Sequence, residues 1–177
     1  MNLTSGQLSA RDALRARQGA GARYDAPEAP AKDLLLARRA TADFARILAE
    51  VEDGALSDPI EGDPARTRAR LLAEIGYGAR RMALALEPLC PVNTSLPAEA
   101  LPDVLPSLDL AATLPAHALR HLFSHSAIHL DVCWRDLPGR HWEAKFTGAD
   151  GAATAVRDLP GLRAESLRRG ALLLGRA

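Results

Sequence analysis

Long segments with apolar residues at helical spacing constrain the fold of this sequence more than any other feature. One of them, Ala31 to Glu52, carries a single stripe formed by Leu36, Ala40, Phe44, Ile47, Leu48 and Val51. Residues three or four positions apart share one face of an α-helix, so this face must be buried. A second stripe follows Asp63-Pro64, which we expect to cap and open a helix that ends before Pro88.

Proline and glycine mark two further helices. Thr113-Leu114-Pro115 opens a helix that runs to Leu137, and Asp158 and Pro160 start a last helix that extends to about Leu174. Between them, residues 142–147 and 153–157 flank a Gly-Ala-Asp-Gly turn and predict a two-stranded hairpin.

The remaining segments are expected to be connections. Residues 1–30 form an N-terminal arm with a short helix over residues 7–18, and Cys90 to Leu110 is a connection with at most a short helix at residues 98–101. Strands and helices do not alternate, which excludes a parallel sheet. We therefore predict a mainly α protein: a four-helix bundle over residues 31–177, preceded by the arm, with a hairpin before the last helix.

Charge and composition exclude several classes of protein. Lys plus Arg and Asp plus Glu each number 22 among the 177 residues, so the net charge is zero. Binding to nucleic acid or to an anionic membrane through bulk charge is not expected. No stretch approaches the ~20 apolar residues of a membrane span, and two cysteines cannot form a disulfide framework. We expect a cytoplasmic protein with a small-molecule ligand, and association with a second chain remains open.

A row of histidines lies within the predicted helix 113–137. His117, His121, His125 and His129 recur every four residues, and Cys133 continues the row. Neighbours four apart can place two imidazoles on one metal ion. Each step also turns by ~40° around the helix axis, so the whole row cannot share one site.

Two interpretations of the row remain open. In the first, either His125 and His129 or His121 and His125 hold a metal together with Glu74 from the helix that follows Asp63-Pro64. In the second, part of the row faces solvent and the rest forms hydrogen bonds inside the bundle. Glu74 also has two interpretations, because it can instead form a surface ion pair with Arg70 or Arg81.

Four segments together carry a family resemblance. They are LLLARRATADFARIL (34–48), AEIGYGARRMA (73–83), ATLPAHALRHLFSHSAIHLDVCWRDLP (112–138) and the helix after Leu159-Pro160. They resemble the maleylpyruvate isomerase family, whose enzymes depend on mycothiol or glutathione and have a DinB-like four-helix fold. The resemblance implies a cis–trans isomerase that adds a low-molecular-weight thiol across an activated double bond, aided by a divalent metal. For such a thiol cofactor we expect contacts from His121 and Arg81.

The family's metal ligands are replaced at the matching positions. Glu74 stands where the family has its first ligand, a histidine, while Ser166 and Gly170 stand where a glutamate and a second histidine belong. The resemblance therefore predicts that the usual metal is absent. The chain ends at Ala177, so we also expect the smaller C-terminal domain of many members to be missing.

Three functions follow from these observations. The chain is a working thiol-dependent isomerase of this family, or a divergent enzyme on a small unsaturated acid, or a non-catalytic paralogue that binds a small ligand or a partner protein. The divergent enzyme would use a metal rebuilt from Glu74, His125 and His129, or Glu74 or a histidine as its acid–base group.

Overall fold

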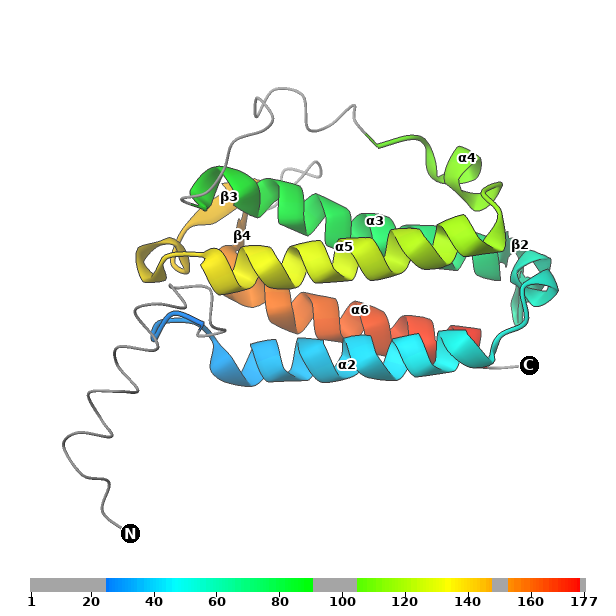
Figure 1. The fold of residues 1–177 in the computed structure, drawn as a ribbon, viewed down its shortest axis with the longest axis horizontal. Coiled ribbons are helices and arrows are strands. Elements are labelled where there is room, and N and C mark those ends of the chain that lie inside the picture. Colours follow the sequence, from blue (N-terminus) through cyan, green and yellow to red (C-terminus); the bar gives the residue numbers. More distant parts are fainter. Residues whose placement is uncertain (1–24, 91–104, 148–152, 176–177) are drawn as a thin grey trace, which may run out of the picture.

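A computed structural model describes residues 25–90, 105–147 and 153–175 (Figure 1). Its helices are α2 (Ala31–Glu50), α3 (Arg68–Leu86), α4 (Leu108–Ala112), α5 (Ala116–Asp136) and α6 (Leu159–Leu174). The strands form two antiparallel hairpins: β1 (Pro59–Ile60) pairs with β2 (Asp63–Thr67), and β3 (Lys145–Thr147) pairs with β4 (Ala153–Ala155). No helix in these ranges is long and apolar enough to cross a membrane.

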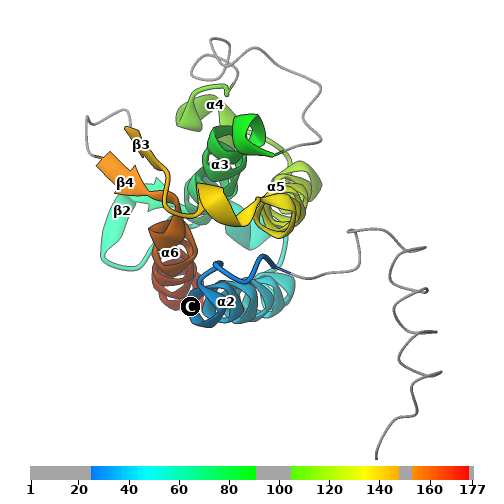
Figure 2. The same cartoon turned by 90° about the vertical axis from the view of Figure 1, so that its left-hand side faces the viewer.

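The four long helices form a bundle of two closely packed pairs. Helix α3 packs along α5, and α2 packs along α6 (Figures 1 and 2). The predicted mainly α four-helix bundle with a hairpin before the last helix is confirmed. Three expectations lie outside the described residues: the helix at residues 7–18, most of the arm 1–30 and the short helix at residues 98–101.

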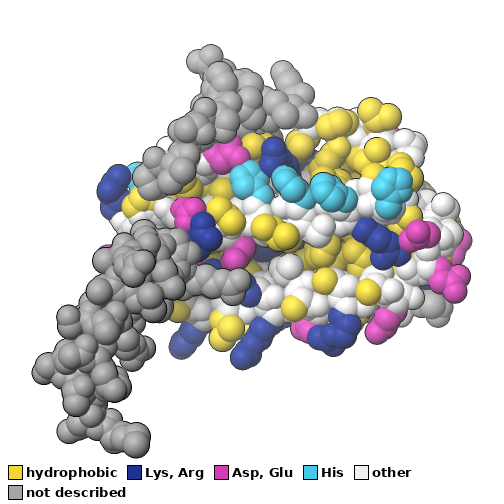
Figure 3. Space-filling model, viewed as in Figure 1, with side chains coloured by type: hydrophobic (Ala, Val, Ile, Leu, Met, Phe, Trp, Pro, Cys, Tyr) yellow, Lys and Arg dark blue, Asp and Glu magenta, His cyan; other side chains and the backbone are white. Residues whose placement is uncertain are grey.

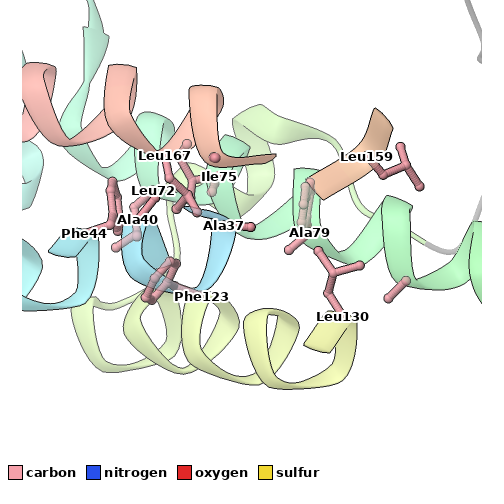
Figure 4. Close-up of a cluster of buried hydrophobic side chains, with 14 of the residues drawn as sticks. Ala37, Ala40, Phe44, Leu72, Ile75, Ala79, Phe123, Leu130, Leu159 and Leu167 are labelled. Atoms are coloured by element: carbon pink, nitrogen blue, oxygen red, sulfur yellow. The ribbon is translucent and has the colours of Figure 1, made fainter. Parts of the chain in front are cut away.

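The core forms where the two pairs meet. The rings of Phe44 of α2 and Phe123 of α5 are in contact, tilted by 42° with centroids 4.9 Å apart. Ile75 and Leu167 bring α3 and α6 into the same cluster (Figure 4). Each fully buried side chain of this kind stabilises the fold by about 1.5–3 kcal/mol. The apolar stripes therefore hold the bundle together, although Leu36, which we expected inside, is exposed.

The predicted start of α3 is wrong. Asp63 and Pro64 lie in β2, and α3 begins at Arg68. The Thr67 side chain caps this helix by accepting a hydrogen bond from the backbone N–H of Arg70. The β1–β2 hairpin reverses through Gly62, whose φ of 81° lies in the left-handed region that favours glycine. Pro64 lacks an N–H and is tolerated in this short exposed strand. As a consequence Arg66 stands in a strand beside α3, not within it.

The connection before α5 also differs from the expectation. Helix α4 occupies residues 108–112, partly inside the segment we expected to be irregular, and Ser107 caps it by accepting a hydrogen bond from the N–H of Leu110. The second hairpin agrees with the expectation, since Lys145 pairs with Ala155 and Thr147 with Ala153.

Candidate functional site

A small pocket between α3 and α6 gathers the three positions at which the sequence resemblance places metal ligands. Glu74 of α3 and Ser166 and Gly170 of α6 all line it, together with Arg66 of β2 and Arg169 of α6. The volume of the pocket is about 200 Å³. Residues 92 or more positions apart in the chain thus meet because α3 and α6 pack side by side.

Glu74 is held by two guanidinium groups. Arg66 Nη2 donates to Glu74 Oε2, and Arg70 Nε lies 3.5 Å from Glu74 Oε1. The Glu74 side chain is 27% exposed, so these pairs are only partly shielded from water. Arg70 also pairs with Asp109 of α4. The expected surface pair of Glu74 with Arg70 is present, and Arg66 is a partner that sequence reasoning missed because it assigned β2 to a helix.

The side chains around Gly170 leave no room for a larger residue at this position. A Cβ atom built there would lie 3.0 Å from Ile75 Cδ1 and 3.1 Å from Phe44 Cε2. Such distances are tighter than ordinary van der Waals contact, so α6 approaches α2 and α3 closely at this residue. A histidine at position 170 would require the core around Phe44 to repack.

The residues of this pocket do not fit the family's metal. Glu74 is already paired with two arginines, Ser166 offers a neutral hydroxyl, and Gly170 has no side chain. Divalent transition metals in such sites require several imidazole, thiolate or carboxylate ligands. Across residues 25–90, 105–147 and 153–175, no group of three such side chains could hold a metal ion.

The histidine row lies along one outer side of α5 (Figure 3). His121 and His125 are exposed and stack with ring centroids 5.6 Å apart, and the rings of His125 and His129 are 6.4 Å apart. The row turns gradually toward α3, so His129 is the member whose ring is largely covered, with 23% of its side chain exposed.

His129 uses both ring nitrogens within the protein. Arg80 Nη1 lies 2.8 Å from Nδ1, and Glu87 Oε1 lies 2.9 Å from Nε2. Because a guanidinium can only donate, Nδ1 accepts, and the neutral ring donates its Nε2 proton to Glu87. Burial, and next the charge of Arg80, lower the pKa of His129.

Glu74 is not brought together with His125 and His129. Glu74 faces α6, whereas Arg80, which contacts His129, follows six residues later on α3. Six residues turn a helix by ~600°, so the two side chains point ~120° apart. Arg81 is exposed on α3, near the phenol of Tyr77, whose pKa is raised by burial. Of the residues predicted for the site, only Glu74 lines the α3–α6 pocket.

Comparison with known proteins identifies the family. The model of the mycothiol maleylpyruvate isomerase N-terminal domain matches residues 37–165. The chain belongs to this family. No curated protein matches it.

Two solved structures of a mycothiol-dependent maleylpyruvate isomerase are similar to this family member. One is the enzyme itself, with a TM-score of 0.67 and 26% identity over 81% of this chain. The other is a histidine-to-alanine mutant, with a TM-score of 0.68 and 26% identity over 82% of this chain. In both cases the match spans 60% of the length of the solved chain. The DinB-like bundle expected from the resemblance is thereby confirmed.

Proposed function

We propose that this chain is a divergent maleylpyruvate isomerase-like protein that acts on a small unsaturated carboxylic acid with a low-molecular-weight thiol and without the family's metal. The observation that carries the proposal is the presence of guanidinium groups in the pocket that the family's ligand positions line. Arg66 and Arg169 line the α3–α6 pocket, and Arg66 Nε is buried without a hydrogen-bond partner among the described residues. A carboxylate is the natural partner for such donors.

The reaction needs a positive charge and a proton acceptor, and this pocket offers both. Glu74 takes the thiol proton, and the thiolate sulfur forms a bond to one carbon of the double bond. The electron pair moves to the adjacent carboxyl or carbonyl group, where Arg66 stabilises the negative charge. The carbon–carbon bond, now single, rotates. The pair then returns, the carbon–sulfur bond breaks, and the thiolate recovers its proton from Glu74.

A turnover assay with maleylpyruvate and mycothiol or glutathione tests this proposal. We expect turnover in the presence of a chelator, and less than a tenth of an equivalent of zinc, iron, manganese or copper retained after exposure and desalting. Glu74→Gln should abolish turnover with a thermal midpoint close to that of the wild type. Arg66→Gln should also abolish it, whereas Arg168→Gln, an exposed arginine of α6, should keep it. About one equivalent of retained metal on which turnover depends would overturn the proposal.

A non-catalytic protein that binds a small ligand or a partner chain is the second candidate. The small volume of the α3–α6 pocket, about 200 Å³, counts against turnover, because a site for a substrate and a thiol together needs more room and ligand pockets usually measure about 300–1,000 Å³. This candidate predicts that maleylpyruvate or the thiol raises the melting temperature by mass action while no product forms. Turnover with either thiol would exclude it.

A further inference from the structure

A larger cavity lies on another side of α6, where α2 and α6 begin and α5 ends. Its volume is about 550 Å³. Helix α5 supplies an apolar wall through Ala127, Ile128, Val132 and Trp134, and α6 supplies Arg163. The volume falls in the ordinary range for small-molecule sites. None of the residues that line the α3–α6 pocket lines this cavity.

Arg163 is a buried cation without an acidic partner among the described residues. Its side chain belongs to the core-facing side of α6, and the residue is only 2% exposed. Nη1 donates to the backbone carbonyl of Ile75 at 2.7 Å, while Nη2 is buried and has no hydrogen-bond partner within the described ranges. Burial alone lowers the pKa of Arg163 to about 10. A buried charge in this state is costly until an anion pairs with it.

The other charged groups around this cavity are already paired. Arg38 Nε donates to Asp131 at 2.7 Å, and its Nη atoms both donate to Asp25. Arg135 binds Asp136 through Nε at 2.6 Å. The one carboxylate of the cavity wall, Asp131, is therefore engaged by Arg38 at the rim. Among the charged side chains that line this cavity, Arg163 is the one with a buried N–H group that lacks a hydrogen-bond partner in the described residues.

A second unsatisfied donor belongs to the same wall. Trp134 lines the cavity, and its Nε1 is buried without a hydrogen-bond partner in the described part of the chain. The indole nitrogen can only donate, as can the guanidinium. Two donors beside an apolar wall are complementary to a ligand that carries acceptor oxygens at one end and a hydrocarbon body at the other.

We propose that the cavity between α2, α5 and α6 is a second ligand site that binds a small carboxylate with an apolar tail. The carboxylate pairs with Arg163 Nη2, and the tail lies against Ala127, Ile128 and Val132 of α5. Trp134 Nε1 donates to the second carboxylate oxygen. The proposal does not depend on turnover at the α3–α6 pocket, because the two sites share no lining residue.

Calorimetric titration of the full chain at pH 7 with hexanoate, and with hexanamide as the neutral match, tests the site. We expect hexanoate to bind and hexanamide to bind at least tenfold more weakly, since one hydrogen-bonded charge typically accounts for such a ratio. Arg163→Met should lower the affinity for hexanoate by at least about tenfold. Arg163→Lys keeps the charge and should lower this affinity by less. Arg168→Gln on the same helix makes the same change of charge at an exposed position and should bind as the wild type does.

Folding is checked by melting each variant, and Arg163→Met should melt no lower than the wild type because it removes a buried charge. The proposal would be overturned if hexanoate at about 10 mM did not bind to the wild type. It would also be overturned if Arg163→Met and the wild type bound hexanoate with equal affinity. Arg66→Gln separates the two sites. It should leave the affinity for hexanoate unchanged, and a loss there would assign the acid to the α3–α6 pocket and overturn the second site.

Discussion

His129 shows how a single side chain of the row differs from its neighbours. Its ring lies between Arg80 and Glu87, and its pKa is lowered by burial and by the charge of Arg80. The unfolded chain, with an ordinary value near 6.5, therefore binds the proton more readily than the folded chain. The contribution of His129 to stability is complete above about pH 6.5 and is lost as the pH falls from there toward the folded pKa.

We predict that His129→Gln flattens the fall in stability between pH 7 and pH 5. Glutamine has no ionisable group and can still accept from Arg80 and donate to Glu87. The measurement is the urea unfolding free energy as a function of pH. His117→Gln, an exposed histidine of the same helix, is the control and should keep the wild-type slope. If the unfolding free energies of His129→Gln and the wild type fell in parallel with pH, the pH dependence could not be assigned to His129.

The two cysteines differ in reactivity although they lie together. The interaction between the two thiol groups lowers the pKa of Cys90, whereas the same interaction and burial raise the pKa of Cys133. Cys90 is partly exposed and Cys133 is buried. Iodoacetamide should therefore label Cys90 at least roughly tenfold faster than Cys133, because the thiolate is the reactive form. Peptide mass spectrometry over time measures both rates, and Cys133 labelled as fast as Cys90 would contradict this.

At the scale of the element, α3 carries two glycines with different surroundings. A Cβ on Gly76 would lie 2.8 Å from Leu122 Cγ of α5, while one on Gly78 would meet Arg163 Nη1 at 3.8 Å, an ordinary contact. Alanine inside a helix gains up to about 1 kcal/mol over glycine. At position 76 this gain is opposed by overpacking, which costs about 1–3 kcal/mol.

We predict that Gly78→Ala unfolds with a larger free energy than Gly76→Ala, by about 1–3 kcal/mol. The two substitutions make the same chemical change two residues apart, so each serves as the control for the other. Urea titration at pH 7 measures the difference. Equal unfolding free energies would mean that Leu122 moves at no cost and that Gly76 does not set the distance between α3 and α5.

The elements differ in how far the sequence could predict them. Helices α2, α5 and α6 follow from apolar spacing and proline positions because their burial repeats every turn. The start of α3 could not be found in this way, since Asp63-Pro64 is typical of a helix start. The β1–β2 hairpin that contains it is short and has an irregular register, so it leaves no regular alternation in the sequence.

The site was predictable only where a motif existed. Glu74, Ser166 and Gly170 could be placed together from the resemblance, and the structure confirms that they line one pocket. Arg66 and Arg163 could not, because each is a single arginine among 22 basic residues with no pattern around it. Each has a buried N–H without a partner among the described residues, and this feature appears only when the chain is folded.

At the scale of the whole molecule, the two helix pairs meet along α3 and α6 and along a second seam between α2 and α5. Phe44 and Phe123 form its apolar centre. Toward the end of α2, Arg120 of α5 donates to the carbonyls of Leu48 and Val51 at 2.6 and 2.5 Å. Arg120 therefore binds carbonyl groups at the end of α2, and of these the carbonyl of Leu48 also accepts from the backbone N–H of Val51 at 3.3 Å. The polar contacts fix one pair against the other, and the cavity of Arg163 opens farther along the same seam.

We predict that Arg120→Met lowers the unfolding free energy by about 1–3 kcal/mol, because two backbone carbonyls lose a charged donor that water replaces only in part. The loss should exceed that of Arg46→Met, the control on the exposed side of α2. Arg46 pairs with Asp43 of the same helix, and its replacement should change the unfolding free energy by no more than about 0.5 kcal/mol. Urea titration followed by circular dichroism measures both variants. Since Arg120 joins the two helix pairs and Arg46 joins residues of one helix, equal losses would mean that the seam is held by its apolar centre alone.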